Sequence, residues 1–177
     1  AIRDADAITR ELQEPGQPVF QAMVERFGSQ IVRADGTLDR AAVADIVFPD
    51  PAALQDLNAI VHPSVGAEIA ARLQAEADGD RVVVLDVPLL VESGRDDMVG
   101  TIVVDCDPEV AVARLVEHRG FREDDARARI ARQVDRAERL AHADFVIEND
   151  GPLEALEPQI ERCWAWILAQ APDAAVD

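Results

Sequence analysis

The sequence contains no lysine: all 17 of its basic residues are arginine. They are outnumbered by 35 acidic residues, which gives a formal net charge of −18 at pH 7. So much negative charge argues against binding to nucleic acid or to anionic membranes, and we expect neither as a partner. Nor does the chain carry the phosphate-binding motif G-x-x-x-x-G-K-[ST], whose lysine it could not supply.

Cysteine, aromatic residues and long apolar runs are scarce as well. The two cysteines, Cys106 and Cys163, make neither a disulfide framework nor a metal site, so a reducing cytoplasmic location is expected. No apolar run approaches the ~20 residues of a membrane-spanning helix, and the opening residues lack the apolar core of a signal peptide. Hydrophobic residues nevertheless make up 49% of the chain, which predicts one globular domain with a small insertion.

A continuous apolar run, Val82 to Leu85, predicts a central parallel strand that is buried on both faces. Asp86 follows at its carboxyl end, and Pro88 cannot extend the hydrogen-bond ladder. Ligands of open α/β sheets bind outside the carboxyl ends of the strands, so Asp86 to Glu92 form a candidate site. The alternative is a core strand followed by an ordinary loop.

Three other strands are predicted, at Ala1–Asp4, Thr101–Val104 and Phe145–Ile147, with helices between them. This order indicates an α/β protein with a parallel sheet. Polar residues follow every strand, and we expect them to converge on one edge: Asp6, Asp86 to Glu92, Asp105 to Asp107, and Asn149. For Asp6 the alternative is a purely structural role as the N-cap of the next helix.

Residues 17–79 form an all-helical block between the first two strands, which is far more chain than a crossover needs. Its first helix has apolar residues at helical spacing and stops at Gly28. Two later helices, 51–61 and 65–77, are predicted to be separated at His62-Pro63. We interpret the block as an insertion that holds a large substrate. His62 either contacts that substrate or is a buried histidine at a helix junction.

Basic residues gather between Arg114 and Arg139, where eight arginines face six acids. This segment carries +2, so the rest of the chain carries −20. A basic island on an acidic protein favours a small anionic ligand. Within it, residues 122–141 predict one weakly apolar helix with Arg129, Arg132 and Arg136 on a shared face, which is typical of a mobile lid. The alternative is a solvated charged helix.

Several short motifs occur together and in order along nearly the whole chain. They are D-A-D-A-I-T-R (4–10), E-P-G (14–16), F-G (27–28), D-G-T-L-D-R (35–40), L-N-A-I-V-H-P (57–63), V-P-L-L-V-E-S (87–93), R-L-V-E-H-R-G (114–120) and A-D-F-V-I-E-N-D-G (143–151). Each is weak alone, but their joint order is specific. The sequence resembles the dephospho-CoA kinase family.

The resemblance implies a P-loop kinase of the nucleoside-monophosphate-kinase type, which transfers the γ-phosphoryl group of ATP to the ribose 3′-hydroxyl of dephospho-CoA. This is the last step of coenzyme A biosynthesis, with ATP and Mg²⁺ as cofactors. It also implies four parts: a core (1–16, 80–118 and 142–170), a CoA-binding helical block (17–79), an arginine-bearing lid (119–141) and a loose tail (171–177).

Matched by position, the family's functional residues give Asp6 the role of base for the attacking hydroxyl. The resemblance places ATP against Arg114, Arg119, Arg132 and Asn149. It places the acceptor substrate against Arg10, His62, Leu89, Leu90 and Glu92. It assigns no metal ligand. Two alternatives remain: a P-loop kinase of another small nucleotide or hydroxyl compound, and a non-catalytic remnant that binds CoA-like ligands.

The family's first strand and phosphate loop are expected upstream of Ala1. We therefore predict that residues 1–177 alone have no kinase activity, because arginines cannot replace the loop's backbone donors, its lysine or its metal-binding hydroxyl. The test is to express residues 1–177 with and without the native upstream segment and to assay phosphorylation of dephospho-CoA. Measurable phosphorylation by the short form would refute this expectation.

Overall fold

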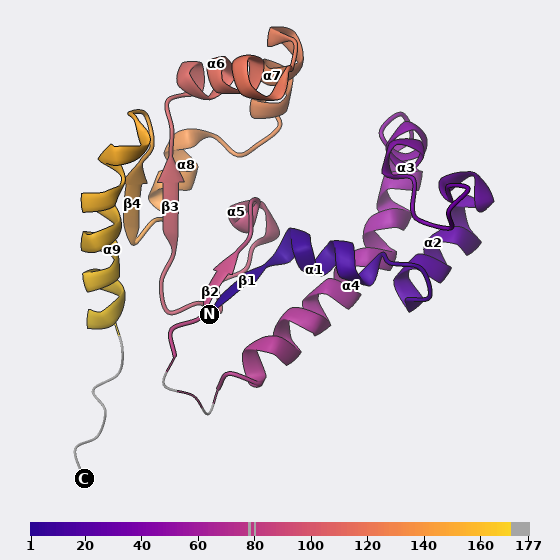
Figure 1. Cartoon of the computed structure of the whole chain (residues 1–177), viewed down its shortest axis with the longest axis horizontal. Coiled ribbons are helices and arrows are strands. Elements are labelled where there is room, and N and C mark those ends of the chain that lie inside the picture. The colour runs from indigo at the N-terminus through magenta and orange to yellow at the C-terminus, as the bar shows by residue number, and fades with distance from the viewer. Residues whose placement is uncertain (78, 80, 171–177) are drawn as a thin grey trace. The chain divides into compact units, whose positions relative to one another are not determined.

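The computed structural model describes residues 1–77, 79 and 81–170, in two compact units, Ala1–Pro88 and Leu89–Asp177 (Figure 1). Helices alternate with short parallel strands in both units, which confirms the predicted α/β class. The loose tail expected at 171–177 lies outside the described residues.

The sheet of the first unit pairs β1 (Ile2–Asp4) with β2 (Val84–Asp86) in parallel, and Asp4 lies opposite Asp86 at the carboxyl end. The predicted strand Val82–Leu85 is thus shifted toward Asp86. Val84 is 38% exposed, so the prediction of a strand buried on both faces is wrong. Among the described residues β2 pairs only with β1. Because it has a neighbouring strand on one side only, its apolar sequence does not ensure burial.

The helical block follows β1 and contains α1 (Ala5–Leu12), α2 (Pro18–Phe27), the 3₁₀ turn η1 (Ser29–Ile31), α3 (Arg40–Val47) and α4 (Pro51–Gln74). As predicted, α2 stops at Gly28, whose φ of 85° suits glycine. The buried core of the block consists of Val19, Met23, Phe27, Ile31, Leu38, Val43, Val47, Ala53 and Val61.

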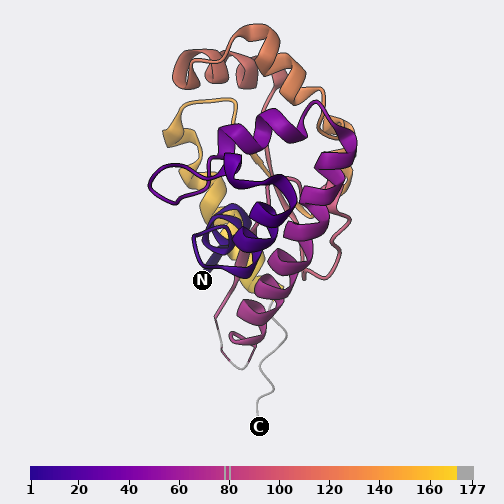
Figure 2. The same ribbon diagram turned by 90° about the vertical axis from the view of Figure 1, so that its right-hand side faces the viewer.

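A single long helix, α4, replaces the two helices that were predicted to meet at His62-Pro63 (magenta in Figures 1 and 2). A proline removes only one intrahelical hydrogen bond, because it lacks only its own N–H. Buried residues on both sides of Pro63, Val61 and Ile69, hold the two halves against their neighbours. Tertiary packing therefore outweighs the local signal to break the helix.

Just beyond α4, a buried carboxylate ties the helical block to the sheet. Glu76, which is 9% exposed, accepts hydrogen bonds from Arg3 on β1 and from Arg81, at 2.5 Å, just before β2. Two guanidinium groups thereby compensate the cost of burying this anion.

The second unit pairs β3 (Ile102–Asp105) with β4 (Phe145–Glu148) in parallel. Its helices are α5 (Leu90–Ser93), α6 (Pro108–Arg119), α7 (Glu123–Ile130), α8 (Arg136–Ala141) and α9 (Glu157–Ala169), with the 3₁₀ turn η2 (Leu153–Ala155) before α9. The predicted start of α6 is confirmed, because the Asp107 carboxylate caps it and Pro108 is its first residue.

The single helix predicted for 122–141 is wrong, because the chain forms α7 and α8 with a break at 131–135. Asp135 caps α8 by accepting the backbone N–H groups of Ala137 and Glu138. The Val134 N–H is donated instead to the Glu92 carboxylate, at 3.0 Å. The shared arginine face that one continuous helix would give is therefore absent.

We predict that Glu76→Ala lowers the free energy of unfolding by about 1–3 kcal/mol, because it leaves Arg3 and Arg81 without their buried partner. Glu68→Ala is the matched control. It removes a half-buried i,i+4 pair with Arg72 on α4, while Arg72 keeps its bond to Glu11, and the expected change is below about 0.5 kcal/mol. Urea unfolding measures both, and equal midpoints would contradict the account.

Candidate active site

The carboxylate of Asp6 stands in the first turn of α1, directly after β1. Asp4 caps this helix: its Oδ1 accepts the backbone N–H groups of Asp6 at 2.8 Å and Ala7 at 3.0 Å. The alternative that Asp6 is the N-cap is therefore wrong. The Asp6 side chain is exposed, and among the described residues none binds its carboxylate.

The buried side of α1 fixes the direction in which its polar residues point. Ile8 is only 1% exposed, whereas Asp6 and Arg10 are both exposed. Residues four apart lie on the same helix face with Cβ atoms roughly 5–6 Å apart. A carboxylate and a guanidinium thus stand one helical turn apart, close to the carboxyl end of β1.

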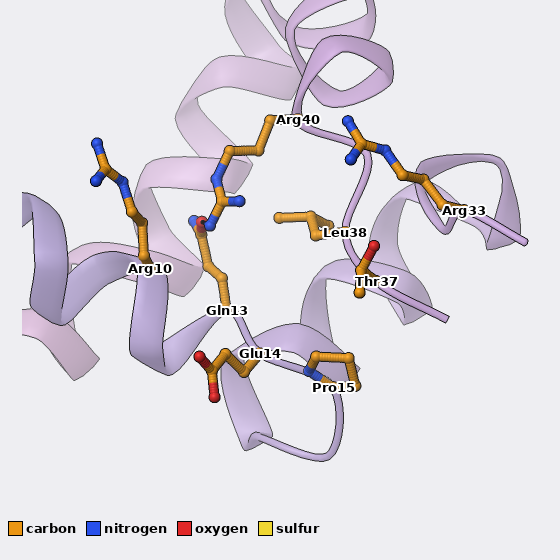
Figure 3. Close-up of a pocket in the computed structure, with 8 residues that line it drawn as sticks. All are labelled: Arg10, Gln13, Glu14, Pro15, Arg33, Thr37, Leu38 and Arg40. Atoms are coloured by element: carbon orange, nitrogen blue, oxygen red, sulfur yellow. Dashed lines mark hydrogen bonds between the residues drawn. The ribbon is translucent and has the colours of Figure 1, made fainter. Parts of the chain in front are cut away.

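A pocket of about 220 Å³ opens at the carboxyl end of α1 (Figure 3). It is lined by Arg10, Gln13, Glu14, Pro15, Arg33, Thr37, Leu38 and Arg40. Arg40 Nη2 donates to Gln13 Oε1 at 3.3 Å, and Arg33 Nε lies 3.7 Å from Asp39 Oδ2. The pocket was not predicted from the sequence, although Arg10 and the D-G-T-L-D-R motif were singled out there.

One wall of this pocket is a tight turn, 33–39. Gly36, at φ 85°, donates its N–H to the Arg33 carbonyl, and Arg33 donates its N–H to the Thr37 carbonyl at 2.8 Å. Hydrogen bonds from the Thr37 hydroxyl and then from its backbone N–H lower the pKa of the Asp35 carboxyl below its ordinary value. Leu38, 4% exposed, anchors the turn in the core. Hydrogen bonds within the turn therefore hold the backbone of this wall in place.

His62 lies on α4, exposed, and is not among the residues that line the pocket. The alternative of a buried histidine at a helix junction is wrong, since α4 has no junction there. Its role in substrate binding stays a prediction.

In the second unit, Arg114 of α6 is held by the segment that follows β4. Its Nη1 donates to the Asn149 carbonyl at 2.5 Å and its Nη2 to the Gly151 carbonyl at 2.8 Å. The structure thus brings together two residues that the sequence assigned to ATP. In this arrangement the guanidinium positions the Asn149 loop, a use that the motif alone did not reveal.

A buried ion pair at the end of β3 was missed by sequence reasoning. Asp105 is 4% exposed, and its carboxylate accepts from Arg136 Nε at 2.9 Å and Nη2 at 2.5 Å. These hydrogen bonds lower the pKa of Asp105. Asp105 had been noted as a polar residue after a strand, but no local signal named Arg136, 31 positions away.

The other residues expected to bind ATP or the acceptor lie at the surface of this unit. Arg119 ends α6 and Arg132 lies between α7 and α8; both are exposed, and no described residue pairs with either side chain. Leu89 is 49% exposed and Leu90 begins α5. Glu92 joins α5 to the α7–α8 connection through its bond to Val134.

Across the described residues, no three His, Cys, Asp or Glu side chains lie close enough together to hold a metal ion. The helices described there also include none that is both long and apolar enough to cross a membrane.

Residues 1–155 match the family model described as Dephospho-CoA kinase. A Streptomyces avermitilis protein named dephospho-CoA kinase is 48% identical over 169 residues, which cover 95% of this chain and 82% of the relative. A Corynebacterium glutamicum protein of the same name is 47% identical over 173 residues, covering 96% of this chain and 86% of that one.

Solved structures agree in fold. The Thermus thermophilus protein TT1252 superposes with a TM-score of 0.78 at 31% identity, covering 97% of this chain and 84% of that one. A dephospho-CoA kinase from Campylobacter jejuni has a TM-score of 0.69 at 23% identity, covering 94% and 84%, which shows a common fold. Because the family model spans most of the chain and relatives are nearly half identical along it, the chain belongs to the dephospho-CoA kinase family.

Proposed function

We propose that the protein transfers the γ-phosphoryl group of ATP to the ribose 3′-hydroxyl of dephospho-CoA, the last step of coenzyme A biosynthesis. The observation that carries this proposal is the exposed carboxylate of Asp6. This carboxylate does not cap α1, because Asp4 does. It lies one helical turn before Arg10, and the helix ends at an arginine-lined pocket.

Phosphoryl transfer asks the protein to position two substrates and to neutralise their charge, with little covalent chemistry of its own. Asp6 would accept the proton of the 3′-hydroxyl and orient its oxygen for attack. Arg119 and Arg132 would contribute positive charge toward ATP, while Arg114 would hold the Asn149 loop beside it.

A Mg²⁺ ion would supply further neutralisation of the ATP phosphates. The described residues hold no cluster of three metal ligands, and we name no residue of this chain as a ligand of the ion. We place the acceptor against the helical block 17–79 with Arg10 and His62, and the roles of Leu89, Leu90 and Glu92 as acceptor contacts stay predictions. Residues 119–141 are the proposed lid, and the cytoplasm is the proposed location.

The function is tested with a coupled ADP-release assay on the full-length protein, offering dephospho-CoA, AMP and shikimate in parallel. Dephospho-CoA is expected to give by far the highest kcat/KM. Preference for AMP or shikimate would indicate a P-loop kinase of another substrate. Binding of dephospho-CoA without turnover would indicate a non-catalytic remnant.

We predict that Asp6→Asn lowers kcat by about 10²–10⁴-fold while the KM for ATP stays unchanged, because the amide cannot accept the proton. Asp50→Asn is the matched control: Asp50 caps α4, and asparagine caps a helix about as well. Steady-state kinetics of both variants decide the matter. Near-normal turnover by Asp6→Asn would remove its catalytic role.

Arg114→Lys is expected to lower kcat/KM for ATP more than Arg132→Lys does. Lysine keeps the charge but loses the fork that reaches both the Asn149 and Gly151 carbonyls. Arg132 is exposed, and we expect neighbouring arginines to supply positive charge toward ATP in its place. Steady-state kinetics at varied ATP concentration compare the two, and equal, small effects would contradict the assigned roles.

A further inference from the structure

Both backbone polar groups of Val134, in the connection between α7 and α8, are held by side chains. Its N–H donates to Glu92 Oε1 at 3.0 Å, and its carbonyl accepts from Arg139 Nη1 at 2.7 Å. Glu92 lies on α5, 42 positions earlier in the chain, whereas Arg139 lies on α8 itself. We call Glu92, Val134 and Arg139 the Val134 clamp. The clamp fixes a residue that belongs to neither α7 nor α8.

Arg132, one of the residues assigned to ATP, stands two positions before the clamped residue. Its N–H donates to the Arg129 carbonyl at 3.3 Å, and the N–H of Gln133 donates to the Ile130 carbonyl at 3.1 Å. The backbone at Arg132 is therefore fixed from both sides, by the last turn of α7 and by the clamp on Val134. Its side chain is exposed and has no partner among the described residues. A guanidinium on a fixed backbone, with its own donors free, suits an anion that arrives from solvent.

The helix that carries one arm of the clamp is anchored to the sheet. Arg136, the first residue of α8, donates to the buried Asp105 carboxylate at the end of β3, from Nε at 2.9 Å and from Nη2 at 2.5 Å. Such a paired contact fixes the direction of the guanidinium as well as its position. Arg139, further along the same helix, therefore holds the Val134 carbonyl from an anchored element.

The other arm of the clamp, Glu92, comes from the single helical turn α5. The Ser93 N–H closes this turn by donating to the Leu89 carbonyl at 3.0 Å, and Gly94 ends it at φ 66°, a left-handed conformation that suits glycine. Glu92 is exposed, and the Val134 N–H is the only group among the described residues that its carboxylate binds. The one contact that the structure gives this carboxylate is therefore with the lid segment 119–141.

We propose that Glu92 is a positioning residue for ATP: through the Val134 clamp it holds the backbone of Arg132 where the guanidinium can meet the ATP phosphates. The inference rests on the proposed function, because it takes Arg132 as an ATP-binding residue. Holding this backbone before ATP arrives reduces the order that must be gained on binding, which favours affinity.

This role differs from the acceptor contact that the family resemblance implies for Glu92, and the two roles predict different kinetics. Loss of a residue that positions the lid weakens the binding of ATP and leaves the acceptor unaffected. Loss of an acceptor contact weakens the binding of dephospho-CoA and leaves ATP unaffected. The Michaelis constants of the two substrates therefore separate the two assignments.

The experiment compares Glu92→Ala, Glu92→Gln and the control Glu161→Ala in the full-length protein. Alanine removes the acceptor of the Val134 N–H, whereas glutamine keeps an oxygen that can accept it. Glu161 is an exposed carboxylate on α9, outside the lid, and no described residue binds its side chain. We expect Glu92→Ala to raise the KM for ATP about fivefold with the KM for dephospho-CoA unchanged. Glu92→Gln and Glu161→Ala should match the parent protein.

Two kinetic results would overturn the proposal. A raised KM for dephospho-CoA with an unchanged KM for ATP would assign Glu92 to the acceptor. A Glu92→Gln variant as impaired as Glu92→Ala would show that the charge of Glu92, and not its hydrogen bond to Val134, is what matters.

A second readout does not depend on activity or on the acceptor. Calorimetric titration with a non-hydrolysable ATP analogue should show about fivefold weaker binding by Glu92→Ala than by Glu92→Gln. Amide hydrogen exchange of the segment 131–135 should be faster in Glu92→Ala alone. Equal affinities of the two variants would overturn the proposal, whatever the exchange shows. If the affinity depends on Glu92 but the parent protein does not phosphorylate dephospho-CoA, the positioning role stands and the proposed function fails.

Discussion

The hydrogen bonds from the Asp4 carboxylate to the first turn of α1 determine where the proposed acceptor site lies. They start the helix immediately after β1, so its first turn stands at the carboxyl end of the parallel strands. They also satisfy the free N–H groups of that turn, which leaves the Asp6 carboxylate available for a ligand. Burial of Ile8 then sets the rotation of the helix and carries Arg10 to the same exposed face. Helix capping and core packing therefore place the proposed base, Asp6, and the cation Arg10 on one exposed face of α1.

Arginine serves two different purposes in this chain. Some guanidinium groups are committed to buried carboxylates: Arg3 and Arg81 to Glu76, and Arg136 to Asp105. These pairs join elements that are distant in sequence and compensate the desolvation of the acid. Others stand at the surface or in the pocket without a close carboxylate. We infer that some of these arginines, Arg119 and Arg132 among them, meet the phosphates of ATP.

Local signals predicted much of the fold. Asp107-Pro108 starts α6 and Gly28 ends α2 as expected, because capping depends on a few neighbouring residues. The family motifs likewise singled out Asp6, Arg10, Arg114 and Asn149, because the order of motifs along the chain can be recognised without knowing the fold. These predictions needed no long-range contact.

Most of the features that were missed depend on contacts between distant residues. Pro63 was expected to end a helix, yet packing on both sides keeps α4 continuous. Asp6 was considered as the N-cap of the first helix, but the structure gives that role to Asp4, two residues earlier. Neither the Asp105–Arg136 pair nor the meeting of Arg10 with the 33–39 turn has a signal within one stretch of sequence.

The central claim is that α1 sets the position of the acceptor, with its hydroxyl at Asp6. A crystal structure of the full-length protein bound to dephospho-CoA and a non-hydrolysable ATP analogue tests this most directly. We expect the ribose 3′-oxygen to lie about 2.6–3.2 Å from an Asp6 carboxylate oxygen. A ribose placed away from Asp6 would contradict it.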